Sequence, residues 1–460
     1  MNKFFREDLK HSDSYAVRSS DGLAKTYKEI FHEAELWSRI METRSVVCVL
    51  CDNSFETVCF ILEMLAAGQA LWILDADTEK TLLDRLIDIY RPHYIWMRKE
   101  AGGYQLSCVS AQRYPIAQEL ALLLSTSGST GSPKMVRISY ENIQDCCERI
   151  FYCYHIGNSE KTVVTLPLHH IFSLSIYIAH WYYGATVLVS NEPLGSRKFK
   201  DIYIRECVNS IIGVPFTFKM LRKTVFWDQK TLGQLHFAMS GGAKLLSEDQ
   251  EWLATNLSEK FWVGYGQTET TALIIGMNFD RTTDKLGSIG KALVGVEVSF
   301  TDEEELIIHS KSVCMGYAYG YEDLCKPDEN HGTVYTGDLA YMDEDGYIFL
   351  KGRKANFINI LGNRTSLDEM ETLLQKKFPE LSVACVGEDD RVSVFSEGQE
   401  ISGWERSIKQ YLLDVAHVPP AMVYCISMKE LPRLGNGKTD YKELKKRMKE
   451  DQDGQDKRDH

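Results

Sequence analysis

The sequence has no uninterrupted apolar run of about 18 residues, the length that a helix needs to cross a bilayer. We therefore expect no membrane span. Residues 1–8 carry several charged side chains and no preceding apolar segment, so they do not resemble a signal peptide. These two absences favour a reducing cytoplasm as the location of the protein.

An excess of positive charge is also missing. The formal net charge is −13, whereas a general nucleic-acid-binding protein needs a basic face. We therefore expect no nucleic-acid partner. A nucleotide ligand stays compatible with this charge, because a single loop suffices to bind one.

The twelve cysteines lack the spacing of a zinc site or of a disulfide scaffold. Cys48 and Cys51 form one C-x-x-C pair beside an expected strand, and no second pair follows at zinc spacing. Most of the other cysteines lie in apolar segments. We interpret them as small buried apolar residues, with metal or redox work as the less favoured alternative.

What is present is an alternation of apolar strands and amphipathic helices in a chain of 460 residues, long enough for two or three domains. Strands separated by helices predict a parallel α/β sheet, with ligands at the carboxyl ends of its strands. The expected strands are residues 46–50, 70–74, 93–97, 120–124, 162–166, 185–189, 210–215, 236–239 and 261–266; the clearest helices are 55–67, 81–90 and 172–183.

The pattern changes after Gly287. Residues 296–300 and 305–309 alternate as half-buried strands do, and residues 341–350 predict a hairpin around Asp345-Gly346. We therefore predict a large N-terminal α/β domain at residues 1–351 that includes a small β-barrel-like region. A small α+β C-terminal domain is expected at residues 352–446, followed by a charged, disordered tail at 447–460.

One polar loop, residues 125–134, follows the expected strand 120–124 and precedes a helix expected from Tyr140. Its glycines, hydroxyls and lysine suit a phosphate cradle, although a flexible linker is the alternative. The Walker pattern is absent, because Pro133 separates Ser132 from Lys134. The candidate phosphate-binding residues are Thr126, Ser127, Gly128, Ser129, Thr130, Gly131 and Lys134.

Five further segments accompany this loop in order along the chain. They are Tyr-Gly-Gln-Thr-Glu at 265–269, Tyr-Thr-Gly-Asp at 335–338, Gly352-Arg353, Gly-Asn-Arg at 362–364, and Leu-Pro-Arg-Leu-Gly-Asn-Gly-Lys at 431–438. With the loop, they resemble the adenylate-forming superfamily of AMP-binding enzymes over residues 20–445. That superfamily contains acyl- and aryl-CoA synthetases, adenylation domains that load carrier proteins, and luciferases.

The resemblance implies an ATP-dependent activation of an acyl or aryl carboxylic acid. An acyl-adenylate forms with release of pyrophosphate, and the acyl group then passes to the thiol of CoA or of a carrier-protein phosphopantetheine. Because both reactants are anionic, this chemistry needs cations and positioning. The resemblance also implies that the C-terminal domain is mobile and rotates between the two steps.

The resemblance assigns the nucleotide-binding roles residue by residue. The loop takes the β- and γ-phosphates, Tyr265 lies against the adenine beside Gly266 and Gln267, and Asp338 accepts bonds from both ribose hydroxyls. Arg353 fixes the ribose–phosphate end. The implied catalytic residues are Thr268 at the α-phosphate, Glu269 as the ligand of Mg²⁺, and Lys438 at the α-phosphate and the carboxylate.

The predicted acid pocket lies around His170 and Gly241. Residues 167–172 match the family segment that borders the acyl group, and Gly241, Gly242 and Ala243 are expected to form a floor beside adenine and acyl group. His170 has a buried core histidine as its alternative. Amino acid-activating relatives usually carry an Asp here, whereas residues 167–178 contain no Asp or Glu, which favours an acyl or aryl acid.

The hinge departs from the family pattern. Relatives usually have Asp or Lys where this chain has Ala355, and often a Lys where it has Asn359. The thioester step is therefore less firmly predicted than adenylation. An amino acid-adenylating enzyme and a catalytically impaired nucleotide-binding scaffold stay as alternatives, whereas the signatures of kinases and P-loop ATPases are absent.

Overall fold

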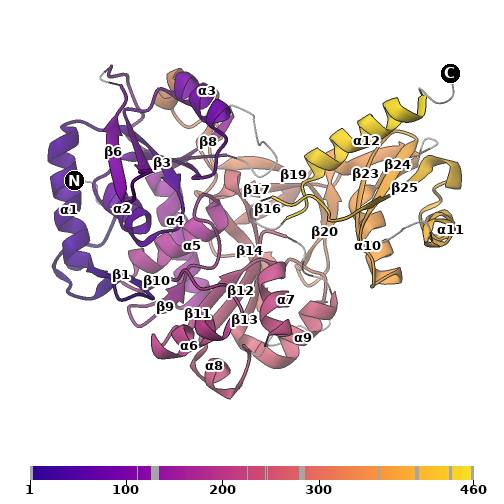
Figure 1. Ribbon diagram of the computed structural model, residues 1–460, viewed down its shortest axis with the longest axis horizontal. Coiled ribbons are helices and arrows are strands. Elements are labelled where there is room, and N and C mark those ends of the chain that lie inside the picture. Colours follow the sequence, from indigo (N-terminus) through magenta and orange to yellow (C-terminus); the bar gives the residue numbers. More distant parts are fainter. Residues whose placement is uncertain are drawn as a thin grey trace. The chain divides into compact units, whose positions relative to one another are not determined.

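The computed structural model describes residues 4–110, 112–125, 134–224, 226–243, 245, 247–278, 285–360, 363–398, 403–434 and 438–456 (Figure 1). The chain divides into two compact units. The large unit comprises Met1–Val298 and Ile307–Val334, and the small unit comprises Ser299–Leu306 and Tyr335–His460. No helix in the described part of the chain is long and apolar enough to cross a membrane.

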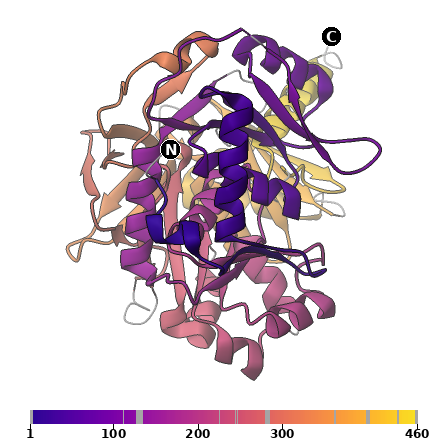
Figure 2. The ribbon, with the colours of Figure 1, turned by 90° about the vertical axis from the view of Figure 1, so that its left-hand side faces the viewer.

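The first sheet of the large unit has seven strands in the order β18-β8-β7-β4-β3-β5-β6. Strands β3, β4, β5 and β7 pair in parallel, as predicted. The strands are β3 Val46–Cys51, β4 Ala70–Asp75, β5 Tyr94–Arg98, β6 Tyr104–Cys108, β7 Leu120–Ser125, β8 Met135–Ser139 and β18 Gly316–Ala318. The accompanying helices are α1 Tyr27–Met41, α2 Phe55–Ala66, α3 Lys80–Tyr90 and α4 Tyr140–Tyr154; Figure 2 shows indigo α1 in front.

The second sheet has nine strands in the order β15-β14-β13-β12-β11-β9-β10-β1-β2. They are β1 Tyr15–Ser19, β2 Ala24–Thr26, β9 Lys161–Val163, β10 Thr186–Val189, β11 Ser210–Gly213, β12 Phe237–Gly241, β13 Phe261–Gln267, β14 Ala272–Asn278 and β15 Lys291–Ala292. Its helices are α5 Ile171–Tyr182, α6 Arg197–Arg205, α7 Pro215–Lys223, α8 Gln229–Gln234 and α9 Ser247–Leu257. Its central strands, from β1 through β13, run parallel.

Both sheets contribute to one hydrophobic core, which explains their apolar strands. Val47 and Val49 of β3 enter this core with Ile212 of β11, whereas Val46 and Cys48 enter a second cluster on the opposite face. Alternate side chains of a strand point to opposite faces, so a strand covered on both sides is apolar throughout. Cys48 and Cys51 are buried in β3, as expected of small apolar residues.

A four-stranded sheet has the order β16-β17-β19-β20. Its strands are β16 Glu297–Phe300, β17 Glu305–His309, β19 Thr333–Met342 and β20 Ile348–Arg353. The predicted hairpin is confirmed: β19 and β20 pair antiparallel, and Gly346 takes a φ of 83° in the turn between them. That left-handed conformation suits glycine.

The rest of the small unit is α+β, with a core of its own. It contains β21 Phe357–Ile360, β22 Asn363–Ser366, α10 Leu367–Lys377, β23 Ser382–Glu388, β24 Arg391–Glu397, α11 Glu405–Ala416, β25 Val423–Met428 and α12 Tyr441–Asp456. The small unit begins earlier than the predicted boundary at residue 352, because it takes in most of the β19–β20 hairpin. A functional hinge at Gly352-Arg353 stays a prediction.

Two local predictions differ from the structure. The loop 125–134 connects two strands rather than a strand and a helix, because β8 (Met135–Ser139) precedes α4. Arg137 in the middle of this segment concealed a strand whose five residues are all buried. The predicted disordered tail also differs, since α12 continues to Asp456, and residues 457–460 lie outside the described residues.

Candidate active site

The predicted phosphate loop is described only at its two ends. Ser125 closes β7, Lys134 directly precedes β8, and Ser125 pairs with Met135 across the two antiparallel strands. The candidates Thr126, Ser127, Gly128, Ser129, Thr130 and Gly131 lie outside the described residues. The strand pairing nevertheless fixes where the loop leaves the sheet and where it returns.

Lys134 and Glu269 meet at a residue that sequence analysis missed. The ammonium nitrogen of Lys134 lies 3.4 Å from the ring centroid of Tyr317 in β18, and the Tyr317 hydroxyl donates a hydrogen bond of 3.1 Å to Glu269 Oε1. Burial and the neighbouring charge of Glu269 raise the pKa of Tyr317. The hydroxyl therefore stays protonated and serves as a donor.

A tight turn after β13 presents Thr268 and Glu269. The short helix η3 (Thr268–Thr270) follows directly, and the Thr270 hydroxyl accepts a bond from Gln267 N at 3.1 Å. A Cβ added to Gly266 would lie 1.5 Å from the Ala272 carbonyl oxygen. The glycine is therefore required by backbone packing, a structural reason that the family motif did not reveal.

Gly241 occupies the end of β12, beside Gly264 of the parallel strand β13. A Cβ added to Gly241 would lie 2.7 Å from Phe172 Cζ, so this glycine makes room for an aromatic ring of α5. Gly242 follows with a left-handed φ of 76°, and both Gly242 and Ala243 are exposed. Phe172 thus connects the predicted floor to the helix that begins after His170.

His170 is the N-cap residue of α5, and its ring centroid lies 4.1 Å from that of His169. His169 Nε2 is 3.6 Å from Asp75 Oδ2 at the end of β4, and burial lowers the pKa of His169. A carboxylate from a distant part of the sequence therefore approaches the predicted acid-binding segment. Residues 167–178, considered alone, gave no sign of it.

The small unit assembles a second group of predicted residues. Asp338 of β19 is 4% exposed and faces Arg353 of β20, whose Nε lies 2.6 Å from Asp338 Oδ1. The Arg353 backbone N–H also donates to Asp368 Oδ2 at 2.9 Å. Burial and the positive charge of Arg353 lower the pKa of Lys438. Arg353 therefore contacts a buried carboxylate and also lies within electrostatic range of a second cation, Lys438.

The donor chemistry of the large unit fits Mg²⁺. Glu269 provides hard carboxylate oxygens, and Mg²⁺ in nucleotide sites takes one or two carboxylates together with phosphate and water oxygens. No cluster of three potential metal ligands occurs within the described ranges. A metal held mainly by a triphosphate does not need one.

The remaining predicted residues are distributed between the units. Tyr265, Gly266 and Gln267 lie at the end of β13 in the large unit. Ala355 belongs to η6 (Lys354–Asn356) and Asn359 to β21 of the small unit, and their side chains lie outside the described set.

Known proteins share this sequence pattern. The family model described as AMP-binding enzyme matches residues 91–318. Luciferin 4-monooxygenase of Luciola mingrelica is 30% identical over 276 residues, which cover 56% of this chain and 49% of that protein. Long-chain-fatty-acid–CoA ligase of Escherichia coli O157:H7 is 26% identical over 368 residues, covering 75% of this chain and 64% of that protein. The chain thus spans from about half to about two thirds of the length of these two relatives.

The fold is shared with solved enzymes. The o-succinylbenzoate–CoA synthetase MenE of Bacillus subtilis, in complex with ATP and magnesium ion, matches with a TM-score of 0.78 at 19% identity, covering 94% of this chain and 96% of that chain. The architecture is therefore that of the acyl-adenylate-forming enzymes, with a large N-terminal and a small C-terminal domain. Residues 91–318 match the AMP-binding enzyme model, so the resemblance found in the sequence is confirmed over that part of the chain.

Proposed function

We propose that this protein uses ATP and Mg²⁺ to convert an acyl or aryl carboxylic acid into an acyl-adenylate, and then transfers the acyl group to a thiol. The observation that carries this proposal is the grouping of Lys134, Tyr317 and Glu269 in the large unit. It presents a cation for phosphate oxygens and a carboxylate for a metal at the end of the predicted phosphate loop. CoA or a carrier-protein phosphopantetheine is the proposed thiol acceptor.

Each group has a role in this reaction. The acid carboxylate attacks the α-phosphorus of ATP and pyrophosphate leaves, so negative charge must be balanced at both ends of the triphosphate. We assign Lys134 and residues 126–131 to the departing phosphates, Thr268 to the α-phosphate, and Glu269 to Mg²⁺, which would neutralise phosphate oxygens. Tyr265, Gly266 and Gln267 would border the nucleotide, with Gly241, Gly242 and Ala243 below it.

The small unit would supply the second set of charges. We assign Asp338 to the ribose hydroxyls, Arg353 to the ribose–phosphate end, and Lys438 to the oxygens between the α-phosphate and the carboxylate. Burial and the charge of Arg353 lower the pKa of Lys438, and an anion bound beside it would favour its charged form. Rotation of the small domain about the 352–355 region would then permit thiol attack.

The acid pocket is proposed around His170, Phe172 and Gly241. The E. coli relative is named for long-chain fatty acids, and the MenE structure for o-succinylbenzoate, so fatty and aryl acids both deserve a test. Amino acids belong in the same panel for a specific reason. Asp75 beside His169 offers a carboxylate that could pair with an ammonium group.

The decisive experiment measures carboxylate-dependent exchange of labelled pyrophosphate into ATP with fatty, aryl and amino acids. We expect at least one acid to support exchange, and Glu269→Gln to lower its rate by about 10²-fold or more. Glu322→Gln, which alters an exposed carboxylate of η5 (Tyr321–Cys325), is the matched control and should leave the rate unchanged. Absence of exchange with every acid would favour the nucleotide-binding scaffold. A follow-up with CoA and with a phosphopantetheinylated carrier protein would identify the acceptor.

A further inference from the structure

Tyr317 links the two oppositely charged groups of the proposed nucleotide site. Its ring face receives the Lys134 ammonium at 3.4 Å, and its hydroxyl donates to Glu269 Oε1 at 3.1 Å. A cation on an aromatic face is attracted by the ring quadrupole, and a hydroxyl orients a carboxylate without neutralising its charge. A neutral side chain thus contacts both groups and leaves both charges intact.

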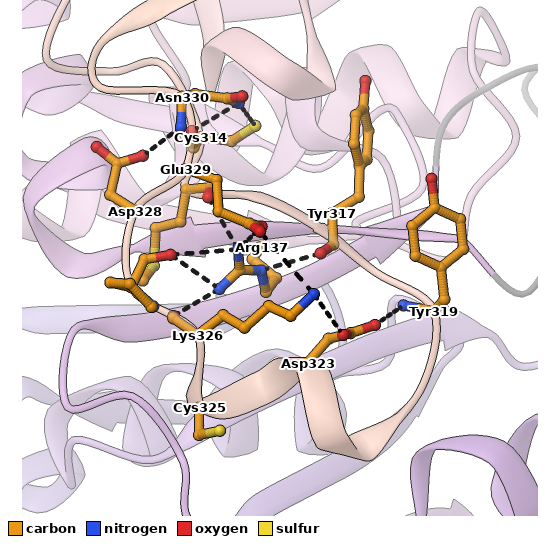
Figure 3. Close-up of polar contacts among 12 residues, drawn as sticks. Arg137, Cys314, Tyr317, Tyr319, Asp323, Cys325, Lys326, Asp328, Glu329 and Asn330 are labelled. Atoms are coloured by element: carbon orange, nitrogen blue, oxygen red, sulfur yellow. Dashed lines mark hydrogen bonds and ion pairs between the residues drawn. The ribbon is translucent and has the colours of Figure 1, made fainter.

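The strand that carries Tyr317 is only three residues long and depends on a buried arginine. Arg137 of β8 is fully buried, and β18 pairs with β8 so that Gly316 faces Arg137. The guanidinium donates to the carbonyl oxygens of Tyr317 at 3.1 Å and of Met315 at 3.0 Å (Figure 3). These bonds fix the backbone on both sides of Gly316.

The same guanidinium secures the segment that follows. It donates to the carbonyl oxygens of Lys326 at 2.6 Å and of Pro327 at 3.3 Å, and it pairs with the carboxylate of Glu329 (Figure 3). A buried guanidinium is tolerated only when its donors are satisfied, and here five oxygen acceptors surround it. The arginine is therefore bonded to residues 315–329 and lies three positions after Lys134.

Glycine 316 permits this arrangement. Its φ is +115°, and an added Cβ would lie 2.9 Å from Glu329 Oε2 and 3.1 Å from Arg137 Nη2. The backbone of the same segment also reaches the metal-binding turn directly, since Cys314 N donates to the Glu269 carbonyl oxygen at 2.8 Å. Two bonds, one from backbone and one from Tyr317, therefore set the position of Glu269.

We propose that Tyr317 is a further residue of the Mg²⁺–nucleoside triphosphate site, which holds Lys134 for the phosphates and Glu269 for the metal, and that Arg137 positions it. This inference rests on the proposed function for the identity of the ligand. The hydroxyl acts on the metal carboxylate, and the ring acts on the phosphate lysine. Removing the hydroxyl and removing the ring should therefore have different effects on the binding of Mg²⁺ and on the binding of ATP.

The test is titration calorimetry of ATP binding to the full-length protein, with Mg²⁺ varied and with EDTA present. Tyr317→Phe keeps the ring, so we expect the Mg²⁺ concentration for half-maximal binding to rise about 5- to 10-fold, while binding of metal-free ATP changes less than about 2-fold. Tyr317→Leu also removes the ring face, and we expect it to weaken the binding of metal-free ATP about 3- to 10-fold in addition.

Tyr319→Phe is the matched control, because Tyr319 lies two residues away on the same segment and is 59% exposed (Figure 3). It should bind Mg²⁺ and ATP as the unaltered protein does. Arg137→Met removes the positioning group. If this variant folds by circular dichroism, it should show the Tyr317→Leu pattern; if it does not fold, the two Tyr317 variants decide.

An unchanged Mg²⁺ requirement in Tyr317→Phe would overturn the inference. It would also be overturned if Tyr317→Phe weakened ATP binding equally with and without Mg²⁺ and lowered the melting temperature of the protein. Binding is measured without any acid, so this outcome is separate from the proposed activity. A protein that binds Mg²⁺–ATP with the expected variant pattern, yet exchanges no pyrophosphate with any acid, would support the inference and contradict the proposed function. A protein that binds no Mg²⁺–ATP would overturn the inference.

Discussion

Two buried histidines of the large unit and a buried glutamate of the small unit have pKa values that are shifted in opposite directions. In the large unit, burial lowers the pKa of His93 and of His180 to about 4 in each case. In the small unit, burial raises the pKa of Glu371 to about 7. The cause is the same, since a dry environment disfavours the charged form of either group. The contributions of these groups to the stability of their units should therefore change with pH in opposite directions.

Whether stability rises or falls with pH depends on whether the folded or the unfolded chain binds protons more readily. The unfolded chain protonates His93 and His180 near their ordinary pKa of 6.5, so the stability that these two histidines contribute to the large unit is lost as the pH falls from 6.5 towards 4. Folding favours the protonated form of Glu371. The small unit is therefore most stabilised below pH 4.5, and loses that contribution as the pH rises towards 7.

The largest difference between the units should appear in catalysis. Lys438→Ala in the small unit should lower acid-dependent pyrophosphate exchange by about 10³-fold, because charge at the reacting oxygens loses its cation. The same variant should largely retain thiol attack on supplied acyl-adenylate, since that step follows adenylation. Single-turnover assays of each step measure both. Equal loss in the two steps would contradict the role assigned to Lys438.

Glu371→Gln should remove the pH-dependent contribution of this residue to the stability of the small unit. Glu371 accepts bonds from the Tyr441 hydroxyl at 2.8 and 2.9 Å and from Cys385 N at 2.9 Å, and an uncharged amide oxygen can accept as well. Because Gln never ionises, the variant should gain about 3 kcal/mol relative to the original protein between pH 4 and pH 8. Hydrogen exchange in peptides of α10 and β23 measures this change.

Peptides of β3 and β5 in the large unit provide the internal control for this experiment. His93 Nδ1 accepts a bond from Val46 N at 2.9 Å at this position, and protonation would remove that acceptor. Protection of these strands should fall in acid in both proteins alike. A Glu371→Gln protein with the same pH profile in α10 as the original would refute the assignment.

Gly241→Ala should affect the large unit alone. The new methyl group would lie 2.7 Å from Phe172 Cζ, and such overpacking costs about 1–3 kcal/mol. We expect a lower melting temperature or an altered preference among acids in the exchange assay. Phe172→Leu, combined with Gly241→Ala, should recover most of the loss by making room. Failure of the second change to compensate would show that the ring does not limit this position.

The smallest effect is expected at the proposed hinge. Ala355→Asp should leave pyrophosphate exchange within about 2-fold, because the proposed hinge acts after adenylation, and should change only thioester formation. Comparing exchange with thioester yield in the same preparation measures this split. An altered exchange rate would place the hinge elsewhere.

The parallel strands were predictable because they are short apolar runs between helices, as in residues 46–50 and 70–74. Strand β8 was not, because Arg137 breaks its apolar pattern. Its charge is balanced by acceptors about 180 to 190 residues further on, a contact that local patterning cannot anticipate. The tail was likewise expected to be disordered on its charge alone, yet α12 extends to Asp456.

The candidate site divides in the same manner. Lys134, Glu269, Asp338 and Lys438 could be predicted because they stand in short segments whose order along the chain is specific. Tyr317 stands in no such segment, and the carboxylate of Asp75 beside His169 comes from another strand. Both become visible only when segments distant in sequence come together in the folded chain.

The sequence by itself determined the α/β architecture and the resemblance to AMP-binding enzymes, because periodicity and ordered motifs are properties of the linear chain. Tertiary structure alone decided which groups touch: Tyr317 with both Lys134 and Glu269, Phe172 with Gly241, and Arg353 with Asp338. The reason is physical. Hydrogen bonding, close packing and charge compensation depend on distances of a few ångströms, which sheet pairing and helix packing set between residues far apart in sequence.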